Sequence, residues 1–257
     1  MIGKLTVGRK LALIYLLDLS AVIFISGILI NEKYIAIDFS RKEMAGNDYI
    51  AAIRDALLPL TREHADAARS ARSAAAIEQA ERQFGTGMRS AELSGEFAAL
   101  LRQAGGTPAA HGGMAPSPAF VAGRELLTRV GNQSNLILDP DLDSYYTMSL
   151  VILRFPELLE VINSTRGLAL QLATAEGAQR QRLQTQFLIL EGRMDATMGG
   201  IGSDYTEAFA ASTPLLRQHL DGSRAALQQA VAQFRASARW PPRGGSVAVP
   251  LRSAWPC

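Results

Sequence analysis

The sequence is poor in cysteine and in aromatic residues. It contains one cysteine, Cys257, which is the last of the 257 residues, so a disulfide framework within the chain is excluded. Aromatic residues make up only 7% of the chain, which suits helical bundles better than β-sandwiches. The formal net charge is only +2, and this near balance gives no indication of a nucleic-acid partner.

Motifs for catalysis and metal binding are also missing. The three histidines, His64, His111 and His219, lie far apart in the sequence and do not have the spacing of metal ligands. The sequence contains no nucleophile elbow, phosphate-binding loop or zinc motif. We therefore expect a protein that is not an enzyme and that needs neither a metal nor a cofactor.

A long apolar run near the N-terminus is the clearest feature that is present. Residues Leu11–Ile30 read LALIYLLDLSAVIFISGILI, and Asp18 is the only charged residue among them. A helix of about 20 residues spans the roughly 30 Å hydrocarbon core of a bilayer. Basic residues, and no acidic ones, precede the run. The sequence therefore predicts a cytoplasmic segment at 1–10, a transmembrane helix at 11–31 and a main domain outside the cytoplasm.

Two points about this run have alternative interpretations. A cleaved signal peptide needs an apolar stretch of about 7–15 residues and a small-x-small cleavage site. The run is longer and no good site follows it, so we favour an uncleaved anchor. Asp18 either hydrogen-bonds across a helix–helix contact, such as a dimer, or lies off-centre and is reached by water.

Helical periodicity continues after the anchor. Apolar or small residues recur every three or four positions, which predicts that the membrane helix extends as a stalk to about Ser70, with a kink at Pro59. A second helical stretch is predicted over residues 73–103. A linker rich in Gly and Pro follows at 105–118.

Two start signals containing proline open the next helices. Ser117 and Pro118 match an N-cap and a first helical position, and their helix is expected to run to about Leu138. Asp139 and Pro140 repeat the signal and predict a further helix.

The last two helical patterns are the longest. The helix opened by the second signal is expected to end within residues 167–177. Over 178–235 one apolar stripe continues, which predicts a helix of roughly 85 Å with a kink at Pro214 or at Gly199–Gly200. Residues 32–238 are therefore predicted to form an all-α domain, an elongated antiparallel bundle of about four helices.

Two segments resemble a known family. Asn135–Tyr146, NLILDPDLDSYY, resembles a motif in the periplasmic sensing regions of bacterial methyl-accepting chemotaxis proteins and related sensor histidine kinases. Asp38–Ala52, DFSRKEMAGNDYIAA, looks like the matching part of the first sensor helix. The resemblance covers about residues 1–235. It implies a protein of the bacterial inner membrane with a periplasmic helical sensor domain. Because the sequence contains one apolar run of sufficient length, we expect this chain to cross the membrane once.

The C-terminal segment departs from that family. In the family a second membrane helix, a linker domain and a signalling module follow the sensor, and we expect this chain to lack all three. Residues 239–257 contain both tryptophans and four of the eleven prolines, so they cannot continue a helix. We expect a disordered tail that is out of frame or truncated, and a downstream reading frame encoding the missing parts would support this.

Candidate ligand-binding residues lie before, within and after the motif. Asn132, Asn135, Tyr145 and Tyr146 are candidates to line a small-molecule pocket between helices, and Arg154 is a candidate partner for an anionic ligand. In the alternative interpretation, the asparagines end a helix, the tyrosines pack in the bundle and the arginine is solvated.

The acidic residues of the motif are Asp139, Asp141 and Asp143. Their oxygens could bind a cation, but the segment lacks the glycine and the distal glutamate of an EF-hand loop. Helix capping and a favourable helix dipole explain them without an ion, so no metal site is predicted.

Together with the resemblance, these patterns predict a chemoreceptor-type sensor for signal transduction in chemotaxis, with a small extracytoplasmic solute as ligand. The apolar stripes at near-heptad spacing indicate a homodimer through the long helices. The alternatives are the input region of a sensor histidine kinase or diguanylate cyclase, and a membrane-tethered helical module that binds another protein.

Overall fold

The computed structural model describes residues 6–61, 66–104, 116–137 and 141–238. All regular secondary structure in these ranges is helical, which confirms the predicted all-α class for the described part of the chain. The chain divides into two units, residues 1–44 and residues 45–257. The first helix, α1 (Val7–Leu57), begins in the first unit and ends in the second.

The first unit contains the apolar part of α1. Its large apolar side chains are exposed, and none of the most apolar 18-residue window of this helix is buried. Within the described ranges, α1 is the one helix that is long and apolar enough to cross a membrane. The predicted anchor at 11–31 therefore agrees with the structure in length and composition.

α1 ends earlier than the sequence predicts. A 3-10 turn, Leu58–Thr61, follows it directly, so the helix does not kink at Pro59 and continue to Ser70. Proline has no N–H to donate, and its ring collides with the carbonyl group four residues earlier. The next helix, α2 (Ala67–Met88), begins at its own N-cap, Asp66, whose carboxylate accepts hydrogen bonds from two N–H groups of the first turn.

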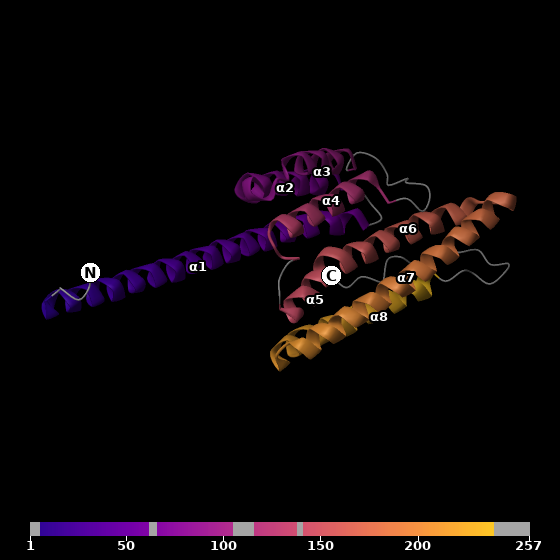
Figure 1. The fold of residues 1–257 in the computed structure, drawn as a ribbon. Helices are drawn as coiled ribbons and strands as arrows, with labels where there is room; N and C mark the ends of the chain where they lie inside the picture. The colour runs from indigo at the N-terminus through magenta and orange to yellow at the C-terminus, as the bar shows by residue number, and fades with distance from the viewer. Residues whose placement is uncertain (1–5, 62–65, 105–115, 138–140, 239–257) are drawn as a thin grey trace. The chain divides into compact units, whose positions relative to one another are not determined.

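The stretch predicted as one helix over 73–103 is two helices. α2 ends at Met88, and α3 covers Ala91–Ala104. Between them Arg89 has a φ of 50°, the left-handed conformation that often terminates helices. The two helices pack against each other (Figure 1).

α4 (Pro118–Gln133) begins as predicted. Ser117 is the N-cap, and its hydroxyl accepts a hydrogen bond from the N–H of Phe120 at 3.3 Å. The helix stops well before residue 138, and Asn135, just beyond its end, has a φ of 67°. Most of the predicted linker, residues 105–115, lies outside the described ranges.

The helix predicted to follow Pro140 begins two residues later. α5 (Leu142–Ser149) has Asp141 as its N-cap, with extended backbone. A π-helical turn, η3 (Leu150–Arg154), connects α5 to α6 (Phe155–Thr174), which ends within the predicted range.

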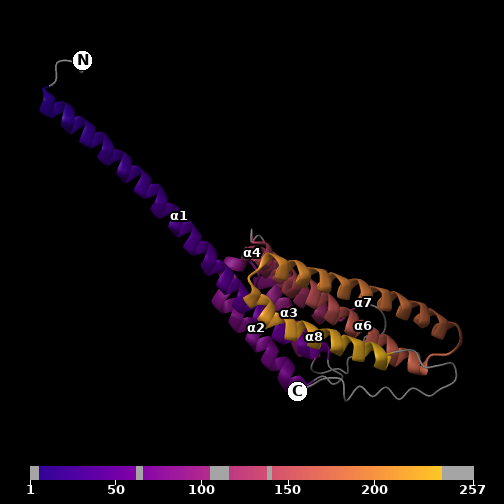
Figure 2. The same ribbon diagram turned by 90° about the horizontal axis from the view of Figure 1, so that it is seen from below.

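The prediction of a single long helix over 178–235 is wrong, because the structure has two helices there. α7 (Gly177–Ala211) passes Gly199–Gly200 unbroken, and α8 (Pro214–Ala238) is a separate helix. Proline is unfavourable within a helix but suits its first position, so Pro214 opens α8. α8 runs back along α6 and α7 (Figure 2).

Two main hydrophobic clusters stabilise the second unit. The first surrounds the end of α1 with α2, α3 and α4, and its largest buried side chains include Tyr49, Phe97 and Phe120. The second lies between α6, α7 and α8, and includes Val161, Ile201 and Val231. An ion pair of 2.5 Å between Asp195 and Arg235 also joins α7 to α8. The predicted 239–257 tail lies outside the described ranges.

The close packing of α1 gives a testable prediction. A Cβ atom on Gly46 would lie 2.2 Å from the Cβ of Ser134, so Gly46→Ala should lower the free energy of unfolding by about 1–3 kcal/mol. Gly95 in α3 faces open space, and Gly95→Ala should raise this free energy by about 0.5–1 kcal/mol. Denaturant unfolding of the detergent-solubilised chain, followed by circular dichroism, measures both. A neutral Gly46→Ala change would contradict the close approach.

Candidate functional site

Two carboxylates are buried among the helices of the second unit. Glu160 in α6 and Asp204 in α7 are each 5% exposed. An ionised carboxylate that is removed from water is stable only with charged partners or several hydrogen bonds. Both carboxylates receive arginine side chains from neighbouring helices.

Glu160 connects three helices. Arg124 of α4 donates from Nη1 to Oε2, and Arg193 of α7 donates from Nη2 to Oε1 at 2.9 Å. The side chains of Arg124 and Arg193 are 43% and 36% exposed, so solvent reaches the cations but not the anion. The network therefore joins a helix of the first cluster to two helices of the second.

Asp204 connects α7 to the segment before α6. Its Oδ2 accepts hydrogen bonds from Nε of Arg154 at 3.0 Å and from the hydroxyl of Ser149 at 2.7 Å. Gly200, one turn earlier in α7, lies beneath the arginine. A Cβ there would be 2.8 Å from the guanidinium carbon, so the absence of a side chain allows Arg154 to cross α7.

The π turn η3 positions Arg154, its last residue. Phe155 donates its N–H to the carbonyl of Leu150, five residues earlier, in place of the four-residue spacing of an α-helix. Pro156 follows and has no N–H, so the carbonyl four residues before it loses its α-helical donor. Such turns frequently occur at functional sites.

A third polar network lies within the first cluster. The hydroxyls of Tyr49 and Ser90 both donate to Oε2 of Glu81 at 2.7 Å. Burial raises the pKa of the Tyr49 hydroxyl above its ordinary value, with the Glu81 carboxylate acting in the same direction, so this group remains a neutral donor. This network links α1, α2 and the start of α3.

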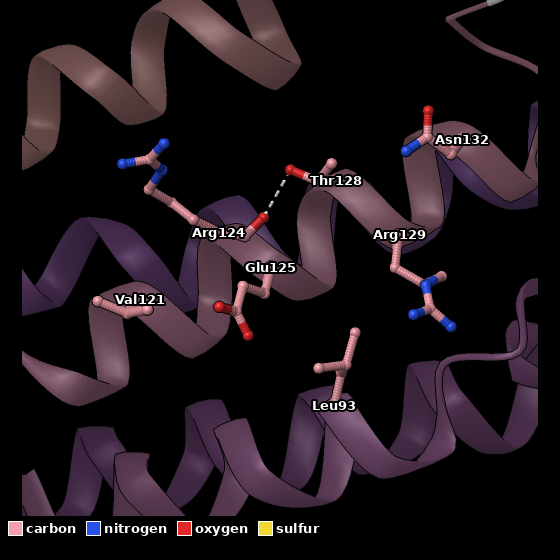
Figure 3. A pocket seen from close by; sticks show the side chains of 7 residues that line it. All are labelled: Leu93, Val121, Arg124, Glu125, Thr128, Arg129 and Asn132. Atoms are coloured by element: carbon pink, nitrogen blue, oxygen red, sulfur yellow. Dashed lines mark hydrogen bonds between the residues drawn. The ribbon is translucent and has the colours of Figure 1, made fainter.

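A surface hollow of about 470 Å³ lies beside α4 (Figure 3). Charged, polar and apolar side chains line it: Leu93, Val121, Arg124, Glu125, Thr128, Arg129 and Asn132. Figure 3 shows Glu125 and Arg129 directed toward α3, whereas Arg124 extends from the other side of α4. Arg129 also donates to the carbonyl of Arg89 at 3.0 Å. Opposite charges beside an apolar wall suit a small polar solute.

The five predicted ligand-binding residues have different surroundings in the structure. Asn132 lines the hollow, and Asn135 lies beyond the end of α4. Tyr145 and Tyr146 contact each other edge to face, with ring centroids 5.2 Å apart. Arg154 pairs with a buried carboxylate and is therefore not simply a solvated side chain.

The acidic residues of the motif are partly described. Asp139 lies outside the described ranges, so its predicted capping role has no structural account. Asp141 occupies the N-cap position but makes no side-chain capping hydrogen bond, and Asp143 accepts from the N–H of Ser144 at 2.9 Å. Within the described ranges, no group of three or more potential metal ligands occurs.

Neither of the buried carboxylates, Glu160 and Asp204, is among the residues predicted from the sequence. A signal was available for Asp204, because it lies at helical spacing between Ile201 and Ala208, which are both buried. A charged residue on the core-facing side of a helix requires an oppositely charged partner, so this position predicts a buried ion pair.

Compared with models of known protein families, with curated proteins and with solved structures, the chain matches none.

The Arg154–Asp204 pair should make a measurable contribution to stability. Arg154→Ala leaves Asp204 with one neutral donor, and we expect a loss of about 1–3 kcal/mol in the free energy of unfolding. Adding Asp204→Ala should remove part of this penalty, giving a coupling energy of roughly 1–2 kcal/mol in a double-mutant cycle. The exposed pair Arg54–Asp55 is the control, and its coupling should stay below about 0.5 kcal/mol. Equal coupling at the two pairs would refute the role of burial.

Proposed function

We propose that this chain is the input region of a membrane-bound chemoreceptor-type sensor. In this proposal residues 1–10 are cytoplasmic, α1 crosses the inner membrane of a bacterium and residues 32–238 form a periplasmic domain. The main support is that one helix contains both an exposed apolar segment and, at Tyr49 and Ile53, buried side chains of the first cluster. The basic residues before that segment support the orientation.

The surface hollow and the buried networks support a sensory role for the helical domain. Glu125 and Arg129 offer charges of both signs, which suits small solutes such as amino acids or organic acids. A ligand shifts an equilibrium between two helix arrangements if it binds one of them better. α4 is tied to α6 and α7 through Glu160, so a solute on α4 can influence both of these helices.

The exposed face of α1 supports the homodimer. Ile30, Tyr34, Ile37 and Met44 follow each other at steps of four, three and seven residues, and each is at least 47% exposed. This is the spacing of a coiled-coil seam. Two copies anchored in one membrane are also held parallel and at the same depth, which favours pairing of the same face.

A single introduced cysteine tests both orientation and dimer. In a Cys257→Ser background, Ile37→Cys expressed in bacteria should react with a membrane-impermeant maleimide in intact cells. It should also form disulfide-linked dimers under mild oxidation, because it lies on the proposed seam.

Ile35→Cys is the matched control, since Ile35 is exposed but lies on the other side of the helix. It should be labelled equally and cross-linked several-fold less. Labelling only after cell lysis would contradict the orientation, and equal cross-linking of the two variants would contradict the seam.

A solute should stabilise the folded domain. The full chain in detergent is heated with amino acids, organic acids and aromatic compounds, and unfolding is followed by circular dichroism. A solute at 100 times its Kd adds about 2.7 kcal/mol, which corresponds to a rise in Tm of several degrees. Saturable stabilisation by one compound class supports the sensor. Absence of any response, with a protein partner bound instead, supports the interaction module.

A further inference from the structure

Glu160 differs from the other buried carboxylate in the number of its partners. Asp204 has one arginine, so that pair is neutral. Glu160 has two, Arg124 and Arg193, and the three groups together have a net charge of +1. The excess positive charge lies on side chains that are more than one-third exposed.

Both guanidinium groups have unused donors. Each has five N–H groups, and each makes one hydrogen bond, to Glu160, among the described residues. The two bonded nitrogens contact different oxygens of one carboxylate. They therefore lie within roughly 8 Å of each other, the span of a carboxylate and two hydrogen bonds of about 3 Å. A second carboxylate approaching from solvent can bridge the pair in a similar way.

We infer that Arg124 and Arg193 form a binding site for a small carboxylate, preorganised by Glu160. The inference rests on the proposed function, specifies the chemical class of the solute and places its carboxylate at Arg124 and Arg193. Of these two arginines, Arg124 is also among the residues that line the hollow. A guanidinium matches the two oxygens of a carboxylate, and the buried glutamate holds both arginines in place before the ligand arrives. A bound carboxylate adds a bridge between α4 and α7, and so strengthens the link between the two clusters.

The test measures anion binding to the full chain in detergent. Acetate, succinate and phosphate are titrated at constant ionic strength, and the arginine Nε–Hε resonances are followed by NMR. Acetate or succinate should shift two of these resonances saturably. Arg124→Gln and Arg193→Gln should each weaken the apparent affinity at least tenfold, and Arg193→Lys, which keeps the charge, should have an intermediate effect.

Arg235→Gln is the matched control. The side chain of Arg235 is 37% exposed and pairs with a single exposed carboxylate, so the affinity should stay within twofold of the wild-type value. Circular dichroism shows whether each variant folds, and Arg193→Lys provides the comparison if a glutamine variant does not.

Three results would overturn the inference. These are no saturable response to acetate or succinate, a response retained in both glutamine variants, or a response to phosphate alone. If a solute stabilises the wild-type chain and both glutamine variants equally, the sensor proposal stands and this site is wrong.

Discussion

The burial of Glu160 is the constraint on which the arrangement of α4, α6 and α7 depends. Its carboxylate is stable in the interior only while arginines from two different helices reach it. Apolar side chains tolerate small sliding between helices, whereas these hydrogen bonds form in one register. In the same way, the buried Asp204 of α7 is stable only while Arg154 of η3 donates to it. We therefore expect the polar networks to select one packing among those that the apolar stripes permit.

The helical class and the start of α4 could be predicted from the sequence, because both depend on residues that are neighbours in the chain. The Ser117 cap is one example, confirmed in detail. The reversal between α7 and α8 could not be predicted in the same way. An apolar stripe has the same spacing in one long helix as in two helices that fold back, since each half still needs a buried face. Only Pro214 could distinguish one long helix from two, and a proline in this position is compatible with a kinked helix as well as with a new helix.

The candidate site was harder to predict, because its residues are far apart in the sequence. Arg124, Glu160 and Arg193 come from three helices, and no local spacing connects them. The residues predicted from the sequence are instead polar residues close to the motif, and of these Asn132 lines the hollow. Arg154 was selected for its charge, but its partner became visible only when α7 was placed beside η3.

The π turn has a consequence for the tolerance of this chain to changes in length. A π turn holds one residue more than the α-helical turn that it replaces. If one residue were lost from Leu150–Arg154, the segment could wind as ordinary α-helix, with α5 and α6 presenting the same faces as before. The same deletion in the middle of α6 or α7 would rotate every later side chain by about 100° around the axis. A single-residue deletion should therefore be tolerated better at η3 than within the helices around it.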